Sequence, residues 1–289
     1  MNRWVLGSRP RTLPAGVVPV LVGTAAVVGV PGAEIVWWRA VAALVAAVAI
    51  QVGTNYLNDA ADGERGVDDH RIGPVRLVGS GLATARSVKL AALAAAGVAA
   101  VAGLALTFAV GPELLVVGAS SFAAGFLYTG GPRPYGYAGL GEVFVFLFFG
   151  LVATVGSAYV HLERVSGLSV AAAVPVGLLA TALLVINNLR DIPTDVVSGK
   201  VTLAVRLGDR DTRGLFGTLI IGAFLSATAV AFVRTGALAV LLAAPLAVQP
   251  MRAVLRGATG TRLIPVLGAT GTLQLVFGAL LAAGLALTP

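Results

Sequence analysis

Two clusters of Asn and Asp side chains repeat one spacing. Asn58 and Asp62 are four residues apart, Asn187 and Asp191 are four residues apart, and Asp195 follows Asp191 at the same interval. Residues i and i+4 lie on one face of a helix, so each set can present its oxygens in one direction. The sequence therefore predicts two groups of oxygen donors, each at the end of an apolar run.

These donors favour a hard metal ion. Clustered carboxylates repel one another unless a positive charge compensates, and the chain has no Cys and only two His, which have no ligand partner at useful spacing. Mg²⁺ prefers oxygen ligands and takes one or two carboxylates plus substrate phosphates. We therefore expect two magnesium ions to hold one diphosphate between the clusters. For any single Asp, the alternative is a solvated loop residue.

Basic residues follow each cluster. Arg71 and Arg76 come after the first, and Lys200 comes after the second. A diphosphate develops negative charge as it leaves, and fixed cations stabilise that charge. The alternative interpretation is that these residues only set membrane topology.

A third polar segment is rich in tyrosine. Tyr128, Tyr135 and Tyr137 surround Arg133 within ten residues. Tyrosines at a membrane interface are usually aromatic anchors, but this density also fits a pocket for an aromatic acceptor. Both interpretations stay open at this point.

Composition shows what must position these residues. The chain has 289 residues, of which 57% are hydrophobic and 11% are charged, against about 25% charged in soluble domains. A spanning helix needs about 20 mostly apolar residues. We therefore predict an all-α integral membrane protein, with residues 1–289 as one membrane domain of nine transmembrane helices. The expected spans are 12–30, 36–57, 88–109, 113–129, 140–160, 168–188, 214–233, 236–251 and 263–287.

The basic residues predict the orientation. With nine spans, 17 of the 20 Lys and Arg residues fall on the side of the N-terminus. The positive-inside rule then places the N-terminus in the cytoplasm and the C-terminus outside. Membrane topology thus explains the net charge of +7, and the charge does not indicate nucleic-acid binding. The segments 55–69 and 187–195 lie four spans apart and so on the same, cytoplasmic side, which indicates a pseudo-repeat with a site between its halves.

The motifs resemble a known family. The segments RPRTLP (9–14), NDAADGERGVD (58–68), RIGPVRLVGSG (71–81), YTGGPRPYGYAGLGE (128–142) and NNLRDIPTDVVSGKVTLAVRLG (187–208) are similar to those of the UbiA superfamily of intramembrane aromatic prenyltransferases. Five residues separate Asp62 from Asp68, where the general superfamily motif has three. This longer form resembles the 1,4-dihydroxy-2-naphthoate polyprenyltransferase group, the MenA type.

The resemblance implies a bundle around a central cavity, with a polar mouth facing the cytoplasm and an apolar body open to lipid. It implies that Mg²⁺ and the diphosphate bind at Asn58, Asp62, Asp191 and Asp195, supported by Asp59 and Asp68. Further substrate-binding candidates are Arg71, Arg76, Arg133, Lys200, Asn187, Asn188, Tyr128 and Tyr135.

The implied reaction takes place at the membrane of a bacterial cell. A polyprenyl diphosphate ionises, 1,4-dihydroxy-2-naphthoate attacks the allylic cation, and loss of CO₂ gives demethylmenaquinone. The alternatives are a related prenyltransferase with another acceptor, including a sugar phosphate, a lipid-binding protein that has lost activity, or a secondary transporter. A transporter would place its ion sites near the bilayer midplane, whereas these carboxylates lie at the ends of the apolar runs.

Overall fold

The computed structural model describes residues 2–67 and 73–288, and within these ranges the chain is helical without strands. Helix is the expected solution for an apolar chain, because in lipid each backbone polar group must be satisfied within the segment. The elements are α1 (Arg3–Gly7), η1 (Pro10–Thr12), α2 (Pro14–Ala25), α3 (Trp37–Glu64), α4 (Ala85–Val110), α5 (Glu113–Thr129), η2 (Tyr135–Ala138), α6 (Gly141–Val145), η3 (Phe146–Val152), α7 (Ala153–Leu162), α8 (Gly167–Val197), α9 (Leu203–Val230), η4 (Thr235–Ala243), α10 (Ala244–Leu255), η5 (Gly260–Arg262) and α11 (Leu263–Leu287).

The prediction of an all-helical membrane protein is confirmed. Seven helical stretches in the described part of the chain are long and apolar enough to cross a membrane. The two shorter apolar helices, α2 and α5, coincide with the other two expected spans. The count of nine spans and the orientation of the termini stay predictions.

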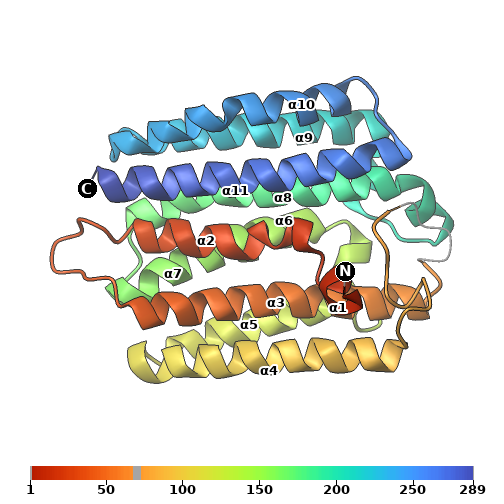
Figure 1. Cartoon of the computed structure of the whole chain (residues 1–289), viewed down its shortest axis with the longest axis horizontal. Helices are drawn as coiled ribbons and strands as arrows, with labels where there is room; N and C mark the ends of the chain where they lie inside the picture. Colours follow the sequence, from red (N-terminus) through yellow and green to blue (C-terminus); the bar gives the residue numbers. More distant parts are fainter. Residues whose placement is uncertain (1, 68–72, 289) are drawn as a thin grey trace.

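The long helices lie side by side as a bundle (Figure 1), with α3 against α4, α8 against α9, and α11 against α2. Local sequence fixes where several of them begin. Thr84, Ser166 and Thr202 each accept a backbone N–H with their side chain at the start of α4, α8 and α9, as N-cap residues do. These caps satisfy backbone N–H groups in the first turns and so fix where α4, α8 and α9 begin.

The main core lies between α2, α8, α9 and α11. Its largest fully buried side chains include Phe216 of α9, Phe277 of α11 and Leu179 of α8. Close approach of α11 to α2 requires glycine, because a Cβ at Gly278 would lie 2.3 Å from a methyl carbon of Val18. Small residues allow membrane helices to pack this closely. Many side chains of α8 are buried in this core, so α8 lies at the centre of the bundle.

Both Asn/Asp clusters lie inside helices. The expected spans ended at 57 and 188, but α3 continues to Glu64 and α8 continues to Val197. The two helix ends lie at the same end of the bundle, at the right of Figure 1, together with the N-terminal segment. The i and i+4 geometry predicted for each cluster therefore applies.

Candidate active site

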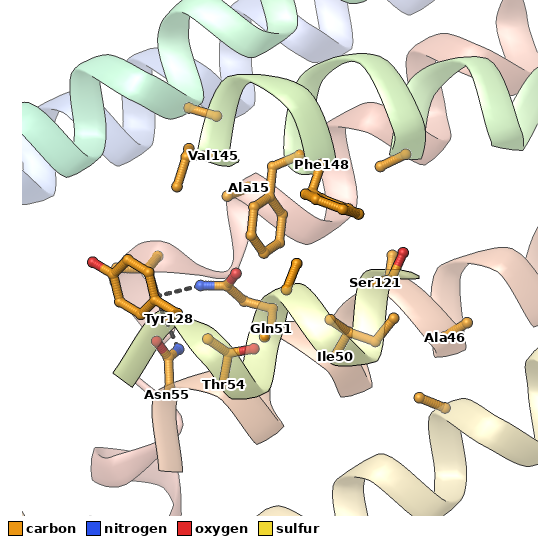
Figure 2. Close-up of a pocket in the computed structure, with 18 of the residues that line it drawn as sticks. Ala15, Ala46, Ile50, Gln51, Thr54, Asn55, Ser121, Tyr128, Val145 and Phe148 are labelled. Carbon is orange, nitrogen blue, oxygen red and sulfur yellow. Dashed lines mark hydrogen bonds between the residues drawn. The ribbon is translucent and has the colours of Figure 1, made fainter. Parts of the chain in front are cut away.

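A cavity of about 800 Å³ lies within the bundle. At one end its lining is polar, and we call this the polar end: Arg9, Asn58, Arg76, Asn187, Asn188 and Lys200. The rest is mostly apolar, with Ile50, Leu104, Phe122, Phe148 and Val152 among its lining residues. Figure 2 shows part of the cavity lining, in which Gln51, Thr54 and Asn55 of α3 lie opposite Val145 and Phe148. The shape suits an amphiphile with a charged head and a long hydrocarbon tail.

The first cluster is buried at the end of α3. Asn58 is 5% exposed and Asp62 is 1% exposed. The hydroxyl of Tyr137 donates to Oδ1 of Asp62, and Nζ of Lys200 lies 3.8 Å from Oδ2 of the same carboxylate. Lys200 follows the second cluster in sequence, so this ion pair joins the two halves of the predicted site.

Asp59 is bonded differently from its neighbours. It is fully buried, and its Oδ2 and Oδ1 accept the backbone N–H groups of Leu77 and Val78 at 2.8 and 3.0 Å. The carboxylate thus fixes the turn that follows Arg76, which lines the polar end. The geometry gives Asp59 a role in positioning this loop.

The second cluster contains a buried ion pair. Nε and Nη2 of Arg190 donate to Oδ1 and Oδ2 of Asp191 at 2.7 and 2.8 Å, and Nη2 also donates to Oδ1 of Asn187 at 2.8 Å. Parallel bonds of this kind are the strong form of an Arg–carboxylate pair. The guanidinium also lies against the loop after the first cluster, because a Cβ at Gly73 would be 3.2 Å from its Cζ.

Two more residues of α8 are held nearby. Nδ2 of Asn188 donates to Oε1 of Glu142 at 2.9 Å, and both side chains are buried. Asp195 is 3% exposed, and its backbone oxygen accepts the N–H of Lys200 at 2.8 Å. This bond ends α8 and sets Lys200 at the polar end.

Aromatic rings form one wall of the cavity. The rings of Tyr128 and Tyr135 meet edge to face at 5.5 Å, and Tyr135 stacks on Phe144 at 4.0 Å. The Tyr135 hydroxyl donates to the backbone oxygen of Ala124 at 2.8 Å, and burial raises the pKa of this phenol above its usual value. Phe148 continues the stack within η3, a π-helical segment. Such segments are rare and often occur at functional sites.

The family model described as the UbiA prenyltransferase family matches residues 16–263, which include α3, α8 and both clusters. The chain belongs to the UbiA prenyltransferase family.

Relatives within the UbiA family cover nearly the whole chain. The 1,4-dihydroxy-2-naphthoate octaprenyltransferase of Mycobacterium tuberculosis is 49% identical, over 98% of this chain and 97% of the relative. The Escherichia coli protein of the same name is 36% identical, over 92% of this chain and 89% of the relative.

Solved structures have the same UbiA fold. A UbiA homolog from Archaeoglobus fulgidus bound to GPP and Mg²⁺ covers 99% of this chain and all of its own, with a TM-score of 0.68 at 17% identity. The apo structure of a UbiA homolog from Aeropyrum pernix K1 has a TM-score of 0.72 at 16% identity, over 98% of this chain and 99% of its own.

The residues of this UbiA member fit a magnesium ion that shares its coordination with a substrate. Among residues 2–67 and 73–288, no three His, Cys, Asp or Glu side chains group closely enough to hold a metal alone. The candidate oxygen donors are the buried side chains of Asn58 and Asp62 on α3 and of Asp191 and Asp195 on α8. Such a partial set suits Mg²⁺, which usually keeps waters and binds through one or two carboxylates plus phosphate.

The predicted site residues fall into four groups. One cavity is lined by Asn58, Arg76, Tyr128, Tyr135, Asn187, Asn188 and Lys200. Four further residues are buried in α3 and α8: Asp59, Asp62, Asp191 and Asp195. Arg133 is exposed and is not among the lining residues. Asp68 and Arg71 lie outside the described residues.

Sequence reasoning assigned no site role to Arg9, Arg190 or Glu142. Arg9 and Arg190 are among the 17 basic residues that predict the orientation, although Arg190 directly precedes Asp191 and Arg9 opens the motif RPRTLP. Their partners are side chains and backbone atoms of the clusters. For Glu142, the signal in the sequence is its position as a single acidic residue at the start of an apolar span.

Proposed function

We propose that this protein transfers a polyprenyl group from a polyprenyl diphosphate to 1,4-dihydroxy-2-naphthoate, with release of diphosphate and CO₂. The carrying observation is the 49% identity, over nearly the full length of both chains, to an enzyme named for this acceptor. The cavity supports the proposal, since its cationic polar end and apolar body match a prenyl diphosphate.

The donor site uses the two Asn/Asp clusters. Asn58, Asp62, Asp191 and Asp195 hold the magnesium ions, which when bound neutralise charge on the diphosphate. Arg76 and Lys200 bind its oxygens, as Arg71 does in the segment outside the described residues. Asp59 acts by holding the turn after Arg76. The solved UbiA homologs bound to GPP and to DMAPP with Mg²⁺ support this assignment by analogy of fold.

The reaction begins with cleavage of the allylic C–O bond, and the diphosphate leaves with the electron pair. Fixed cations at the polar end stabilise this developing charge, and the apolar body shields the allylic cation from water. The ring carbon that bears the carboxylate then forms the new C–C bond. Loss of CO₂ returns its electrons to the ring and restores aromaticity. The immediate product is the quinol, and a two-electron oxidation gives demethylmenaquinone.

The acceptor lies against the aromatic wall. Tyr128, Tyr135, Phe144 and Phe148 present ring surface beside the polar end, and aromatic rings prefer offset-stacked or edge-to-face contacts. Asn187 and Asn188 supply hydrogen bonds there. The polar end faces the cytoplasm of a bacterial cell membrane, and the two clusters are the matching parts of a pseudo-repeat.

The acceptor assignment is tested with purified protein in detergent. The protein is given one labelled polyprenyl diphosphate and a set of aromatic acids, and the products are identified by mass. We expect prenylation of 1,4-dihydroxy-2-naphthoate, with a product that is lighter than the simple adduct by the mass of one CO₂. Preference for an acceptor that keeps its carboxylate after prenylation would contradict the naphthoate assignment and leave the prenyltransferase assignment intact.

A further inference from the structure

Arg9 occupies a backbone position that favours glycine. It follows the last turn of α1 with φ of +54°, and it is one of two non-glycine residues with positive φ among those described. Just beyond the end of α1, its N–H donates to the backbone oxygen of Leu6. Helices commonly end in this left-handed conformation, usually with glycine because a Cβ is disfavoured there. An arginine at this position indicates that its side chain has a functional role.

The side chain reaches the first cluster. Nη2 of Arg9 donates to Oδ1 of Asn58 at 2.6 Å and to the backbone oxygen of Asn55 at 3.2 Å. Asn58 Oδ1 is the atom through which this amide would bind a metal ion. The guanidinium therefore lies next to the position that the donor diphosphate occupies if the proposed function is correct.

The remaining donors of Arg9 have no partner among the residues that the structure describes. Its Nε is buried without a hydrogen bond, and its Nη1 makes none to a residue that the structure describes. Arg9 also lines the cavity. A guanidinium has five N–H donors in a planar fork that matches phosphate oxygens. A buried N–H without a partner costs free energy, so a ligand that accepts from it would bind favourably here.

The neighbouring polar contacts hold the N-terminal segment in place without Arg9. Asn55 Nδ2 donates to the backbone oxygen of Ser8 at 2.9 Å, and the hydroxyl of Tyr56 donates to the backbone oxygen of Trp4 at 2.7 Å. Gln51 and Asn55 both donate to the hydroxyl of Thr12. The segment is thus fixed to α3 by several bonds, and the Arg9 side chain is available for another role.

We propose that Arg9 is a substrate-contacting residue, which binds the donor diphosphate through its remaining guanidinium donors while Nη2 holds Asn58. This inference rests on the proposed function and adds to it a diphosphate ligand from the N-terminal segment. In this arrangement the segment from α1 to η1 closes the donor site on the side of α3.

The test measures binding of inorganic pyrophosphate with Mg²⁺ to the purified full-length protein by calorimetry, together with the melting temperature of the ligand-free protein. We compare wild type, Arg9→Gly, which suits the backbone, Arg9→Lys, which keeps the charge, and Arg3→Ala. Arg3 is the matched control, because it lies in the same segment and bonds a backbone oxygen of the loop, away from the cavity.

We expect Arg9→Gly to weaken pyrophosphate binding roughly 10- to 100-fold, as for the loss of hydrogen bonds to a charged group. Its melting temperature should stay at or above that of wild type. Arg9→Lys should bind with intermediate affinity, and Arg3→Ala like wild type. Wild-type affinity in Arg9→Gly, or an equal loss in Arg3→Ala, would overturn this inference alone. Absence of binding by wild type would overturn the proposed diphosphate site and this inference with it.

Discussion

The carboxylate of Asp191 accepts two parallel hydrogen bonds from the guanidinium of Arg190, at 2.7 and 2.8 Å, and both side chains are almost fully buried. The pair is formed by adjacent residues near the end of α8, within the second cluster. A protein cation therefore already neutralises one proposed ligand of magnesium. Two more proposed ligands also contact a cation, since the Asn58 amide oxygen accepts a hydrogen bond from Arg9 and the Asp62 carboxylate lies beside Lys200.

The first prediction concerns the stability of this pair. Asp191→Leu leaves the buried guanidinium of Arg190 with Asn187 as its remaining partner in the described part of the chain. Breaking a buried ion pair in this way should cost about 3–5 kcal/mol. The measurement is thermal unfolding in detergent. The double variant Arg190→Met, Asp191→Leu should recover most of the loss, because no unpaired charge remains. Equal melting temperatures for the single and double variants would contradict the prediction.

Asp59 should act on the donor site through its loop. Asp59→Ala removes two bonds to the backbone of Leu77 and Val78 and should cost about 1–3 kcal/mol, since both N–H groups lose their partner. We expect faster proteolysis in residues 73–84 and a higher KM for the diphosphate donor. The exposed Asp211→Ala serves as the control. An unchanged KM with a weaker affinity for Mg²⁺ would show instead that Asp59 is a metal ligand.

Tyr135 provides a prediction about pH. Burial raises the pKa of this phenol above its ordinary value of 10.0, so the folded protein favours the neutral form. Its contribution to stability is complete below about pH 10 and is lost as the pH rises through the folded-state pKa. Thermal unfolding of wild type and Tyr135→Phe, which loses the bond to Ala124, should differ by a constant amount between pH 7 and about pH 9. The difference should shrink above about pH 10. A gap that narrows already near neutral pH would contradict this.

The cavity body should limit the donor tail. Gly156 of α7 lines the cavity, and a Cβ there meets nothing within 4 Å. Gly156→Leu should fill this space and lower turnover of long polyprenyl donors roughly tenfold, since overpacking costs about 1–3 kcal/mol. Geranyl diphosphate, a short donor, should be much less affected. Gly214→Leu is the matched control, because Gly214 also has open space but does not line the cavity. Equal losses for long and short donors would contradict a role in accommodating the tail.

The helices and the two clusters were predictable because their signals are local. Run length identified the apolar helices, and the four-residue spacing placed Asn58 with Asp62 and Asn187 with Asp191 on helix faces. The continuation of α3 to Glu64 and of α8 to Val197 was not predicted. The hydropathy of the sequence falls at these helix ends, because their polar side chains point into the interior of the protein. Polar residues inside a membrane bundle look like the start of a loop in a hydropathy pattern.

The partners of the charged groups were not predictable from spacing. Asp59 lies next to Asn58 in sequence, yet its carboxylate bonds a backbone turn 18 residues away. Arg9 and Arg190 have long side chains whose partners depend on tertiary packing, and counting them as topology signals hid their contacts. The π-helical segment at Phe146–Val152 also has no signal in an unbroken apolar run.

The most direct test of the central claim measures three products of one reaction. Purified protein in detergent receives a polyprenyl diphosphate, 1,4-dihydroxy-2-naphthoate and Mg²⁺, and CO₂, diphosphate and the prenylated quinol are quantified. We expect equal molar amounts of all three, a requirement for Mg²⁺, and a rate at least about 100-fold lower in Asp62→Asn, because this carboxylate would hold the magnesium ion that stabilises the charge of the transition state. Wild-type turnover in Asp62→Asn, or release of diphosphate without a prenylated product, would contradict it.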